Sequence, residues 1–321
     1  MKRKSINLLI ILVLLVSSIL LITCSNQVTK SILDAITLWL NTLVPNLLPF
    51  FLLVEFLNSY GVTDIIAKIS QKFMMCVFHV SGNGCFVFMA AMLSGFPSGA
   101  KYIKDLLDSG KIDIDEANYL YRFAHFVNPL FVLGVVATLL QNMQVSYFIL
   151  ISHYLATYLL AFICRPSLKK AIVVSKNDTF SNIIDSKRQS TTFIKTLNYG
   201  IQKALMTLTS MLGIIIFFFI LTTLLTSVLP LSKTSSTLIS GILEMSQGIL
   251  KVSNLTFTPV IKASIITFLI SFSGFSIILQ SLSVISDTSI SFKKFIPTRI
   301  KIGIISVFLF NIFYYLVGAF F

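Results

Sequence analysis

The sequence predicts an all-α polytopic membrane protein with six to eight membrane segments, arranged as an inverted repeat with broken or re-entrant helices. Composition is the first observation. Apolar residues make up 55% of the 321 residues and charged residues only 12%, whereas soluble domains contain about 25% charged residues. The second is a series of runs without Lys, Arg, Asp or Glu, each long enough for a spanning helix of about 20 residues. The third is a pair of these runs that Ser, Gly and Pro interrupt.

The net charge of +13, from 25 basic and 12 acidic residues, indicates topology and not nucleic-acid binding. Most Lys and Arg residues lie between the apolar runs, where basic loops orient a membrane protein. Four scattered cysteines without a CxxC pair and the lack of an HExxH sequence favour neither a disulfide framework nor a metal site. With no Walker A or GxSxG sequence, we expect no enzyme, no catalytic residue, no metal and no cofactor. The three histidines are expected to be packed or interfacial: His79, His125 and His153.

The charge-free runs give the order of the elements along the chain. They are residues 5–29, 35–54, 73–100, 125–164, 204–232, 263–286 and 302–321. They divide the chain into an N-terminal transmembrane helix, a first repeat, a basic cytoplasmic loop and a second repeat: residues 1–30, 31–164, 165–203 and 204–321. The first helix has the basic start of a signal peptide, but its apolar stretch is long for one, so we expect it to be retained.

The basic loops set the orientation. The start of the chain and the loop 165–203, with eight basic and two acidic residues, are predicted to be cytoplasmic. Residues 125–164 supply two crossings with a turn near Gln141, so residues 73–100 must enter and leave on one side. Whether residues 263–286 cross or re-enter stays open. Their crossing would place a last basic group in the cytoplasm, namely Lys293, Lys294, Arg299 and Lys301.

The first interrupted run ends with Ser-Gly-Phe-Pro-Ser-Gly-Ala-Lys. Pro97 disfavours helix at the residue before it, and glycines permit unwound backbone. Irregular backbone at membrane depth is tolerated only beside protein or a water-filled cavity, and the free N–H groups of a half-helix suit anions. We therefore predict half of a substrate site here, with tight packing of small residues as the alternative. The residues are Ser94, Gly95, Phe96, Ser98, Gly99 and Lys101, of which the lysine can instead extend to the headgroups.

The second interrupted run repeats the Ser-Gly-Phe core at Ser273-Gly274-Phe275 and continues to Gln280. Each core follows a span and then an amphipathic stretch. Before the first core these are residues 35–54 and 63–80, and before the second core they are residues 204–232 and 238–252. The two preceding spans are predicted to cross in opposite directions. Paired breaks in an inverted repeat indicate a substrate site near the middle of the membrane. Ser273, Gly274 and Gln280 form the predicted second half, with packing again the alternative.

Two polar positions accompany the breaks. Glu244 is the only acidic residue between Asp185 and Asp287, and an intramembrane carboxylate is costly and usually functional. A solvated interfacial position is the alternative. Asn128 either faces the cavity or begins a helix. We predict that Glu244 and Asn128 are polar gate or coupling residues, and we include Gln247 among the substrate-binding residues.

Five stretches, in this order along the chain, carry a resemblance to a known family: residues 41–51, 93–101, 128–131, 243–248 and 272–280. The most specific of them is Ser-Gly-Phe-Pro-Ser-Gly-Ala-Lys, which begins at Ser94. Together they resemble the sporulation integral membrane protein YlbJ family, also called SpoVV. Members of this family carry the nucleoside-recognition (Gate) domain, which is related to the core of concentrative nucleoside transporters.

The resemblance implies a role in endospore formation. Family members act in the mother cell, at the outer forespore membrane, and are associated with moving dipicolinic acid toward the forespore. We therefore expect a secondary transporter or permease for a small anionic metabolite, most simply dipicolinic acid, with the lipid bilayer around it and no nucleic-acid partner. One alternative is a membrane scaffold that holds other sporulation membrane proteins through the basic loop. Another is a nucleoside-type Gate-domain transporter.

Overall fold

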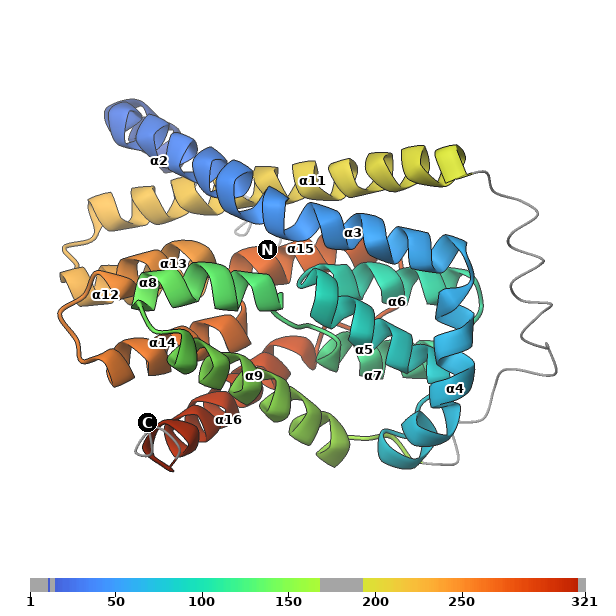
Figure 1. Cartoon of the computed structure of the whole chain (residues 1–321). Helices are drawn as coiled ribbons and strands as arrows, with labels where there is room; N and C mark the ends of the chain where they lie inside the picture. The colour runs from blue at the N-terminus through green and yellow to red at the C-terminus, as the bar shows by residue number, and fades with distance from the viewer. Residues whose placement is uncertain (1–10, 12–14, 168–192, 317–321) are drawn as a thin grey trace, which may run out of the picture.

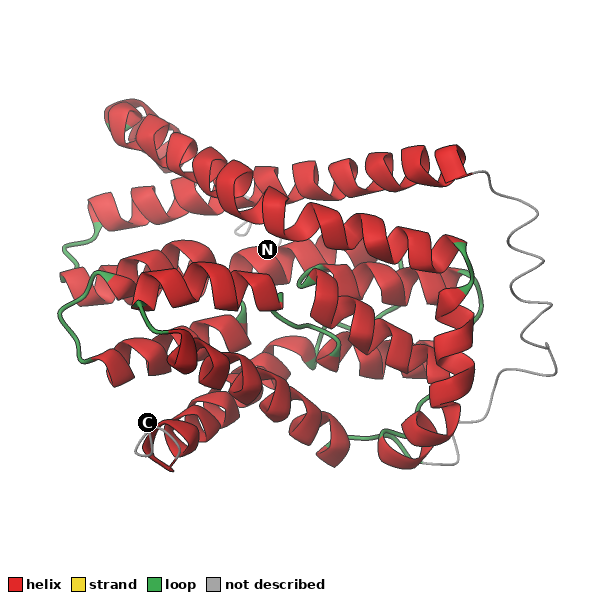
Figure 2. Cartoon of the chain, in the orientation of Figure 1, coloured by secondary structure: helices red, strands yellow, loops and turns green. Residues whose placement is uncertain are grey.

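The computed structural model describes residues 11, 15–167 and 193–316, and these fold almost entirely into helices (Figure 2). No β-strand occurs in these described ranges. Within the described part of the chain, four helices are long and apolar enough to cross a membrane, and the number rises to six if each of two bent helix pairs counts as one span. The predicted class, an all-α polytopic membrane protein, is therefore confirmed.

The first half of the chain contains a bent span, an amphipathic helix, a hairpin and two further membrane segments. Helical residues 15–23 end at a turn at Cys24. The elements that follow are α2 (Ser25–Leu38), the π-helix η1 (Trp39–Leu43), α3 (Val44–Ser59), α4 (Val62–Val77), α5 (Gly82–Ser94), α6 (Ser98–Asp108), α7 (Ile114–Phe123), the π-helix η2 (Phe131–Val136), α8 (Ala137–Leu140) and α9 (Met143–Ile163).

Two boundaries in this half test the sequence prediction. The turn predicted near Gln141 is confirmed, because Gln141 has φ +52° and the side chain of Asn142 caps α9. The predicted start of the second span near residue 35 is wrong, since α2 already begins at Ser25. The charge-free criterion fails there because Lys30 and Asp34 are exposed on a continuous helix.

The second half repeats the order of span, hairpin, broken helix and span. Its elements are α11 (Phe193–Val228), α12 (Lys233–Leu243), α13 (Met245–Ser253), α14 (Pro259–Phe272), α15 (Gly274–Ile285) and α16 (Phe295–Leu316). The helix α11 packs along α2 and α3 and runs in the opposite direction (Figure 1). Together these helices form one side of the molecule, and the two hairpins lie beneath them.

The hairpins α5–α6 and α12–α13 extend from opposite ends of the molecule toward its centre (Figure 1). The first hairpin is followed by the segment α7–η2–α8, which is interrupted at residues 124–130, and the second by α14–α15, which is interrupted at Ser273. This opposed order of hairpin and broken helix is the inverted repeat that the sequence predicts.

The predicted correspondence between the two halves is wrong in detail. Of residues 63–80, all up to Val77 belong to the single amphipathic helix α4, which packs along α5, whereas residues 238–252 form a hairpin that turns at Glu244. The Ser-Gly-Phe core at Gly95 lies at a hairpin tip, and the one at Ser273 lies inside a broken span. By position in the fold, Gly95 therefore corresponds to Glu244, and Asn128 corresponds to Ser273.

The segment whose crossing stayed open forms a continuous candidate span. Pro259–Ile285 extends over 27 residues despite the break at Ser273. Its far end reaches the first hairpin, where Lys104 contacts Asp287 with a nitrogen–oxygen distance of 2.8 Å. At this same end Arg165 donates to the carbonyl of Val77, and Lys203 pairs with Asp105. The basic regions of both halves thus lie at one end, as expected for a cytoplasmic face.

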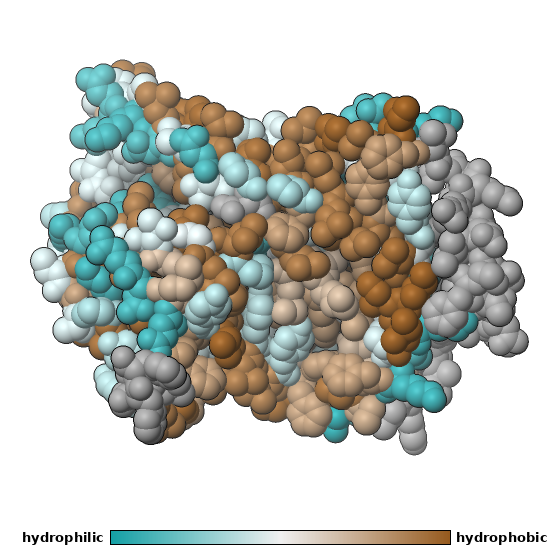
Figure 3. Space-filling model, in the orientation of Figure 1, coloured by the Kyte–Doolittle hydropathy of each residue, from teal (hydrophilic) through white to brown (hydrophobic). Residues whose placement is uncertain are grey.

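The outer surface agrees with a membrane-embedded body. In Figure 3 hydrophobic side chains cover the middle of the visible face, and hydrophilic ones gather toward the two ends of the molecule, along the direction in which α11 runs. Large apolar side chains such as Met206, Ile304 and Phe308 are more than half exposed, as lipid-facing residues are.

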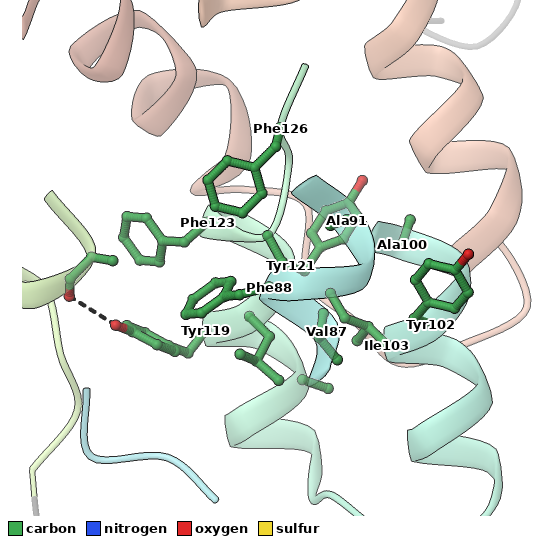
Figure 4. Packing of buried hydrophobic residues seen from close by; sticks show 14 of the residues in the cluster. Val87, Phe88, Ala91, Ala100, Tyr102, Ile103, Tyr119, Tyr121, Phe123 and Phe126 are labelled. Carbon is green, nitrogen blue, oxygen red and sulfur yellow. Dashed lines mark hydrogen bonds between the residues drawn. The ribbon is translucent and has the colours of Figure 1, made fainter. Parts of the chain in front are cut away.

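Aromatic packing holds the first hairpin against α7. Phe88 on α5, Tyr102 and Ile103 on α6, and Tyr119 and Phe123 on α7 are all buried in one cluster (Figure 4). The hydroxyl of Tyr119 also donates to the carbonyl of Ala161 at 2.8 Å, which ties α7 to the end of α9. This cluster is the rigid base from which the tip of the first hairpin extends toward the centre.

Candidate functional site

The tip of the first hairpin is a short unwound segment between Ser94 and Ser98. Gly95 has φ +74° and ψ 177°, and the Phe96–Pro97 peptide bond is cis. The hydroxyl of Ser98 donates to the carbonyl of Gly95. A Cβ atom on residue 95 would lie 2.8 Å from the Cβ of Asn128. Glycine is therefore required both by the backbone conformation and by the close approach to residue 128.

Asn128 connects this tip to the broken segment that follows α7. Its Nδ2 donates to the carbonyl of Leu93 at 2.7 Å, and its Oδ1 accepts the backbone N–H of Leu130 at 2.7 Å. The side chain is 2% exposed. Asn128 thus begins the helical segment, as one of the two interpretations from the sequence expects, and it also holds the hairpin tip.

Glu244 forms the tip of the second hairpin. It adopts an extended conformation between α12 and α13, and its Oε2 accepts the backbone N–H of Gln247 at 2.6 Å. The side chain is 2% exposed, so the solvated interfacial alternative is wrong. The two arms of this hairpin, α12 and α13, approach so closely that a Cβ atom on Gly248 would lie only 2.0 Å from the Cα of Gly241. The close approach therefore requires glycine at position 248.

The break at Ser273 lies against this second tip. Ser273 has φ +74°, and a Cβ atom on Gly274 would lie 3.0 Å from the backbone nitrogen of Met245. On its other side the hydroxyl of Ser273 contacts Nε2 of His125 at 3.1 Å. The four discontinuities of the fold are therefore in contact: Gly95 with Asn128, Glu244–Met245 with Gly274, and Ser273 with His125.

A pocket lies where these four discontinuities meet, and we refer to it as the central pocket. Its cavity volume is about 40 Å³, and the empty space around it, including the part that opens to solvent, is about 480 Å³. It therefore has room for a few waters, and its walls must separate before a larger ligand can enter. Its lining residues are Leu43, Leu47, Gly95, Phe96, Val127, Asn128, Phe131, Met211, Ile215, Glu244, Met245, Ser246, Ile277 and Gln280.

Five of the twelve predicted site residues line the central pocket: Gly95, Phe96, Asn128, Glu244 and Gln280. Four of the others support its walls. Ser94 contacts the hydroxyl of Tyr102, Ser98 donates to Gly95, Gly99 packs on Ala124, and Ser273 contacts His125. The last three are Gly274 and Gln247, which lie at the base of the second tip, and Lys101.

Lys101 is held in an ion-pair network. Its ammonium lies 2.7 Å from Oε1 of Glu55, which also contacts Lys203, and Lys203 in turn pairs with Asp105 at 3.0 Å. We call these four residues the ion-pair network. Both readings of Lys101 from the sequence, anion attraction and extension to the headgroups, are therefore replaced by a link between the first hairpin, α3 and α11.

A second pocket adjoins the central pocket. The two share Met211 and Gln280 as lining residues, and the second pocket extends along α11 to Met206 and along α15 to Val284. Lys203 of the ion-pair network lies one helical turn before Thr207, another lining residue. Met211 and Gln280 thus lie between the two pockets, and the ion-pair network lies outside the lining of both.

The sequence prediction misplaced Arg299. It was assigned to the cytoplasmic charges, but the side chain is completely buried on α16, and its Nη2 donates to the carbonyl of Ser271. Its Nε and Nη1 have no partner, and it forms no ion pair, within the described part of the chain. The spacing of Phe295, Arg299, Ile302 and Ser306 on one buried helix face is the signal that could have located it.

Two histidines complete this buried polar group. Nδ1 of His153 contacts the hydroxyl of Ser271 at 3.0 Å, and His125 contacts Ser273 as described. Both are fully buried, which confirms the packed placement predicted for these two. We call Arg299, His125, His153, Ser271 and Ser273 the Arg299 cluster. No group of three or more His, Cys, Asp or Glu side chains suited to a metal ion occurs among the described residues.

The fold and its site define a polytopic α-helical membrane protein with two opposed hairpins, two broken helices and a small buried pocket between them. The chain is 30% identical to the sporulation integral membrane protein YlbJ of Bacillus subtilis (strain 168), over 299 residues that cover 84% of this chain and 73% of the relative. It therefore belongs to the family of sporulation integral membrane protein YlbJ. No protein-family model matches the chain, and no solved structure matches it.

Proposed function

We propose that this protein is a secondary transporter for a small anionic metabolite, with dipicolinic acid at the outer forespore membrane as the most specific assignment. The observation that carries the proposal is the central pocket, because residues from two opposed hairpins and two broken helices line it together. Discontinuous helices around a midplane pocket are typical of transporters that expose one site alternately to the two sides.

The chemistry of the pocket supports a small polar substrate. Its walls are mainly apolar, with the amides of Asn128 and Gln280, the hydroxyl of Ser246 and the carboxyl group of Glu244 among them. A few convergent polar groups on an apolar wall are the usual composition of a small-molecule site. The backbone N–H groups at the start of α13 add donors suited to a carboxylate. Because the chain belongs to a family of sporulation membrane proteins, a metabolite that spores need is a consistent substrate.

Uptake into vesicles tests the proposal. The purified protein is reconstituted into liposomes, and accumulation of labelled dipicolinate is compared with that of labelled nucleosides. The variant Gln280→Leu removes the polar group shared by both pockets at nearly constant volume, and we expect dipicolinate uptake to fall at least about tenfold at unchanged thermal stability. Ser286→Ala, at an exposed serine just beyond α15, is the matched control.

The results distinguish the candidate functions. Dipicolinate uptake that Gln280→Leu abolishes supports the anion transporter. Uptake of nucleosides alone would assign the same pocket to the nucleoside-type alternative. If the wild-type protein moves neither, the transport proposal fails, and the scaffold reading takes its place.

A further inference from the structure

The central pocket contains a single ionisable side chain. Among its lining residues only Glu244 can carry a charge, and the polar neighbours Asn128, Ser246 and Gln280 are neutral. An anionic substrate therefore meets one carboxyl group and no cation in the pocket. This arrangement is unexpected for an anion site and requires an explanation in terms of charge.

The carboxylate of Glu244 occupies the place that a substrate anion would need. Its Oε2 accepts the N–H of Gln247 at 2.6 Å, at the N-terminus of α13. Free N–H groups and the positive end of the helix dipole attract anions there. Two negative charges 4 Å apart repel by about 4 kcal/mol even at an effective dielectric constant of 20, so ionised Glu244 and a bound carboxylate exclude one another.

Gln280 supplies a second, independent indication of a missing partner. Its side chain is 3% exposed, and its Nε2 donates to the hydroxyl of Ser276 at 3.3 Å. Its Oε1 has no partner in the part of the chain that the structure describes. A buried acceptor without a donor is costly. An O–H donor in the pocket, which a neutral carboxyl group at Glu244 provides, would satisfy it.

Among the described residues, the helices around the tip place no charged side chain other than Glu244 in the wall of the central pocket. Helices α12, α14, α15 and α8 pack against α13, and α15 and α8 contain no charged residue. Lys233 begins α12, and Lys262 near the start of α14 donates to the carbonyl of Ser253. On α13 itself, Lys251 does not line the pocket and donates at 2.7 Å to the hydroxyl of Ser240, which lies one helical turn before Glu244. His125 lies behind Phe96 and does not line the pocket.

We propose that Glu244 couples anion binding to proton binding. Glu244 takes up one proton from solvent and releases the N-terminus of α13. One carboxylate of a small dicarboxylate anion then accepts the freed N–H groups in its place. This inference rests on the proposed anion-transport function and adds the coupling ion to it. Each anion crosses together with one proton, which the neutral carboxyl group carries.

Binding measured against pH tests the coupling. Purified full-length protein in detergent is titrated with labelled dipicolinate while the pH is lowered from about 8 to about 5.5, and a pH indicator reports proton uptake on binding. We expect the wild-type affinity to rise with falling pH, approaching about tenfold per pH unit, the limit for one linked proton. One proton should be taken up per anion bound.

Three variants separate the carboxyl group from the fold. Glu244→Gln keeps an oxygen that can cap α13 but cannot ionise, so its affinity should be independent of pH and its binding should take up no proton. Glu244→Asp keeps an ionisable cap and should keep the pH slope. Glu116→Gln changes a carboxylate bound to Ser81, outside the pocket, and should also keep the slope.

Each outcome decides the proposal. A pH slope that persists unchanged in Glu244→Gln overturns the coupling and leaves the anion-transport function standing. Failure of both wild-type and Glu244→Gln protein to bind dipicolinate at any pH overturns the proposed function and the coupling together. A slope present in wild type, Glu244→Asp and Glu116→Gln but absent in Glu244→Gln supports the coupling.

Discussion

Gly95 and Arg299 carry costly local features. Gly95 lies at a hairpin tip, and Arg299, on the continuous helix α16, donates to the carbonyl of Ser271, two residues before the break at Ser273. The backbone of Gly95 has a conformation that residues other than glycine hardly adopt. Arg299 is a fully buried cation with two unpaired N–H sites and no ion pair among the described residues. Plain lipid-facing helices such as α11 contain no comparable feature. Concentration of such costs at the breaks agrees with a functional centre there, because strain and unpaired charge persist where function requires them.

Alanine at Gly95 tests whether the first hairpin tip is required. Gly95→Ala forces a Cβ atom to within 2.8 Å of the Cβ of Asn128 and adds backbone strain on the order of 1–3 kcal/mol. We expect a lower thermal midpoint in detergent and loss of dipicolinate uptake. Gly213→Ala, at a helical glycine with no atom within 4 Å of the added Cβ, is the control and should change neither. Normal uptake by Gly95→Ala would show that the tip geometry is not needed.

Replacing Arg299 tests whether the buried charge serves function at the expense of stability. Arg299→Met keeps the length of the side chain but removes a buried charge that has only one hydrogen bond. Because burial of an unpaired charge costs more than one hydrogen bond returns, we expect an unchanged or higher thermal midpoint together with reduced uptake. Lys301→Met, at an exposed cation on the same helix, is the control. A large drop in the thermal midpoint would instead identify Arg299 as a structural cap for α14.

At the scale of elements, ion pairs fix the first hairpin to its neighbours at the predicted cytoplasmic end. Lys101 and Glu55 are almost fully buried, whereas the pair Lys104–Asp287 is largely exposed. The hydrogen bond from Lys104 lowers the pKa of Asp287 below its ordinary value, so this pair stays ionised at neutral pH. Buried and exposed pairs on one helix allow a direct comparison of their energies.

A double-mutant cycle measures the buried pair. Glu55→Gln and Lys101→Met, singly and combined, should show a coupling energy on the order of 0.5–3 kcal/mol in thermal or denaturant unfolding, because Glu55→Gln leaves the buried ammonium of Lys101 without its carboxylate and Lys101→Met leaves Glu55 with Lys203 alone. The same cycle with Lys104→Met and Asp287→Asn should give about 0–1 kcal/mol, since water screens exposed pairs. Equal coupling energies in the two cycles would contradict the link between burial and hairpin anchoring.

The sequence was sufficient for the elements whose signal is local. The turn at Gln141, the break around Pro97 and the unwound residue at Ser273 follow from glycine, proline and polar residues in apolar runs. The hairpin at Glu244 was missed because its arms, α12 and α13, are only 11 and 9 residues long and read as one amphipathic stretch. The match of the three residues Ser-Gly-Phe in the two halves therefore paired the hairpin tip at Gly95 with the broken span at Ser273.

The site was predictable as a set of residues but not as a geometry. Five predicted residues line the pocket because breaks in apolar helices mark irregular backbone wherever they occur. Lys101 and Arg299 were misassigned because the role of a cation depends on its partners, which lie far away in sequence. Glu55 is 46 residues from Lys101, and Ser271 is 28 residues from Arg299.

At the scale of the whole molecule, a crossing by the candidate span Pro259–Ile285 would make charge and fold consistent. With that span complete, α4, the end of α9, the start of α11 and the loop before α16 all lie at one end of the molecule, together with the basic residues around them. The second hairpin enters from the other end. For the proposed transport function, two opposed hairpins around one pocket would give each side of the membrane its own access route, as alternating exposure of a site requires.

Cysteine labelling from the two sides of the membrane tests this topology. In a variant whose four native cysteines are replaced by alanine, Lys233→Cys places a thiol at the start of α12, and Ser109→Cys places one just after α6. Positive charge at the end that contains Ser109 predicts that this end is cytoplasmic. A membrane-impermeant maleimide should therefore label Lys233→Cys in intact cells and Ser109→Cys only after permeabilisation. If both positions react in intact cells, or if only Ser109→Cys reacts, the two hairpins do not enter from the sides that the charges assign, and the predicted orientation is wrong.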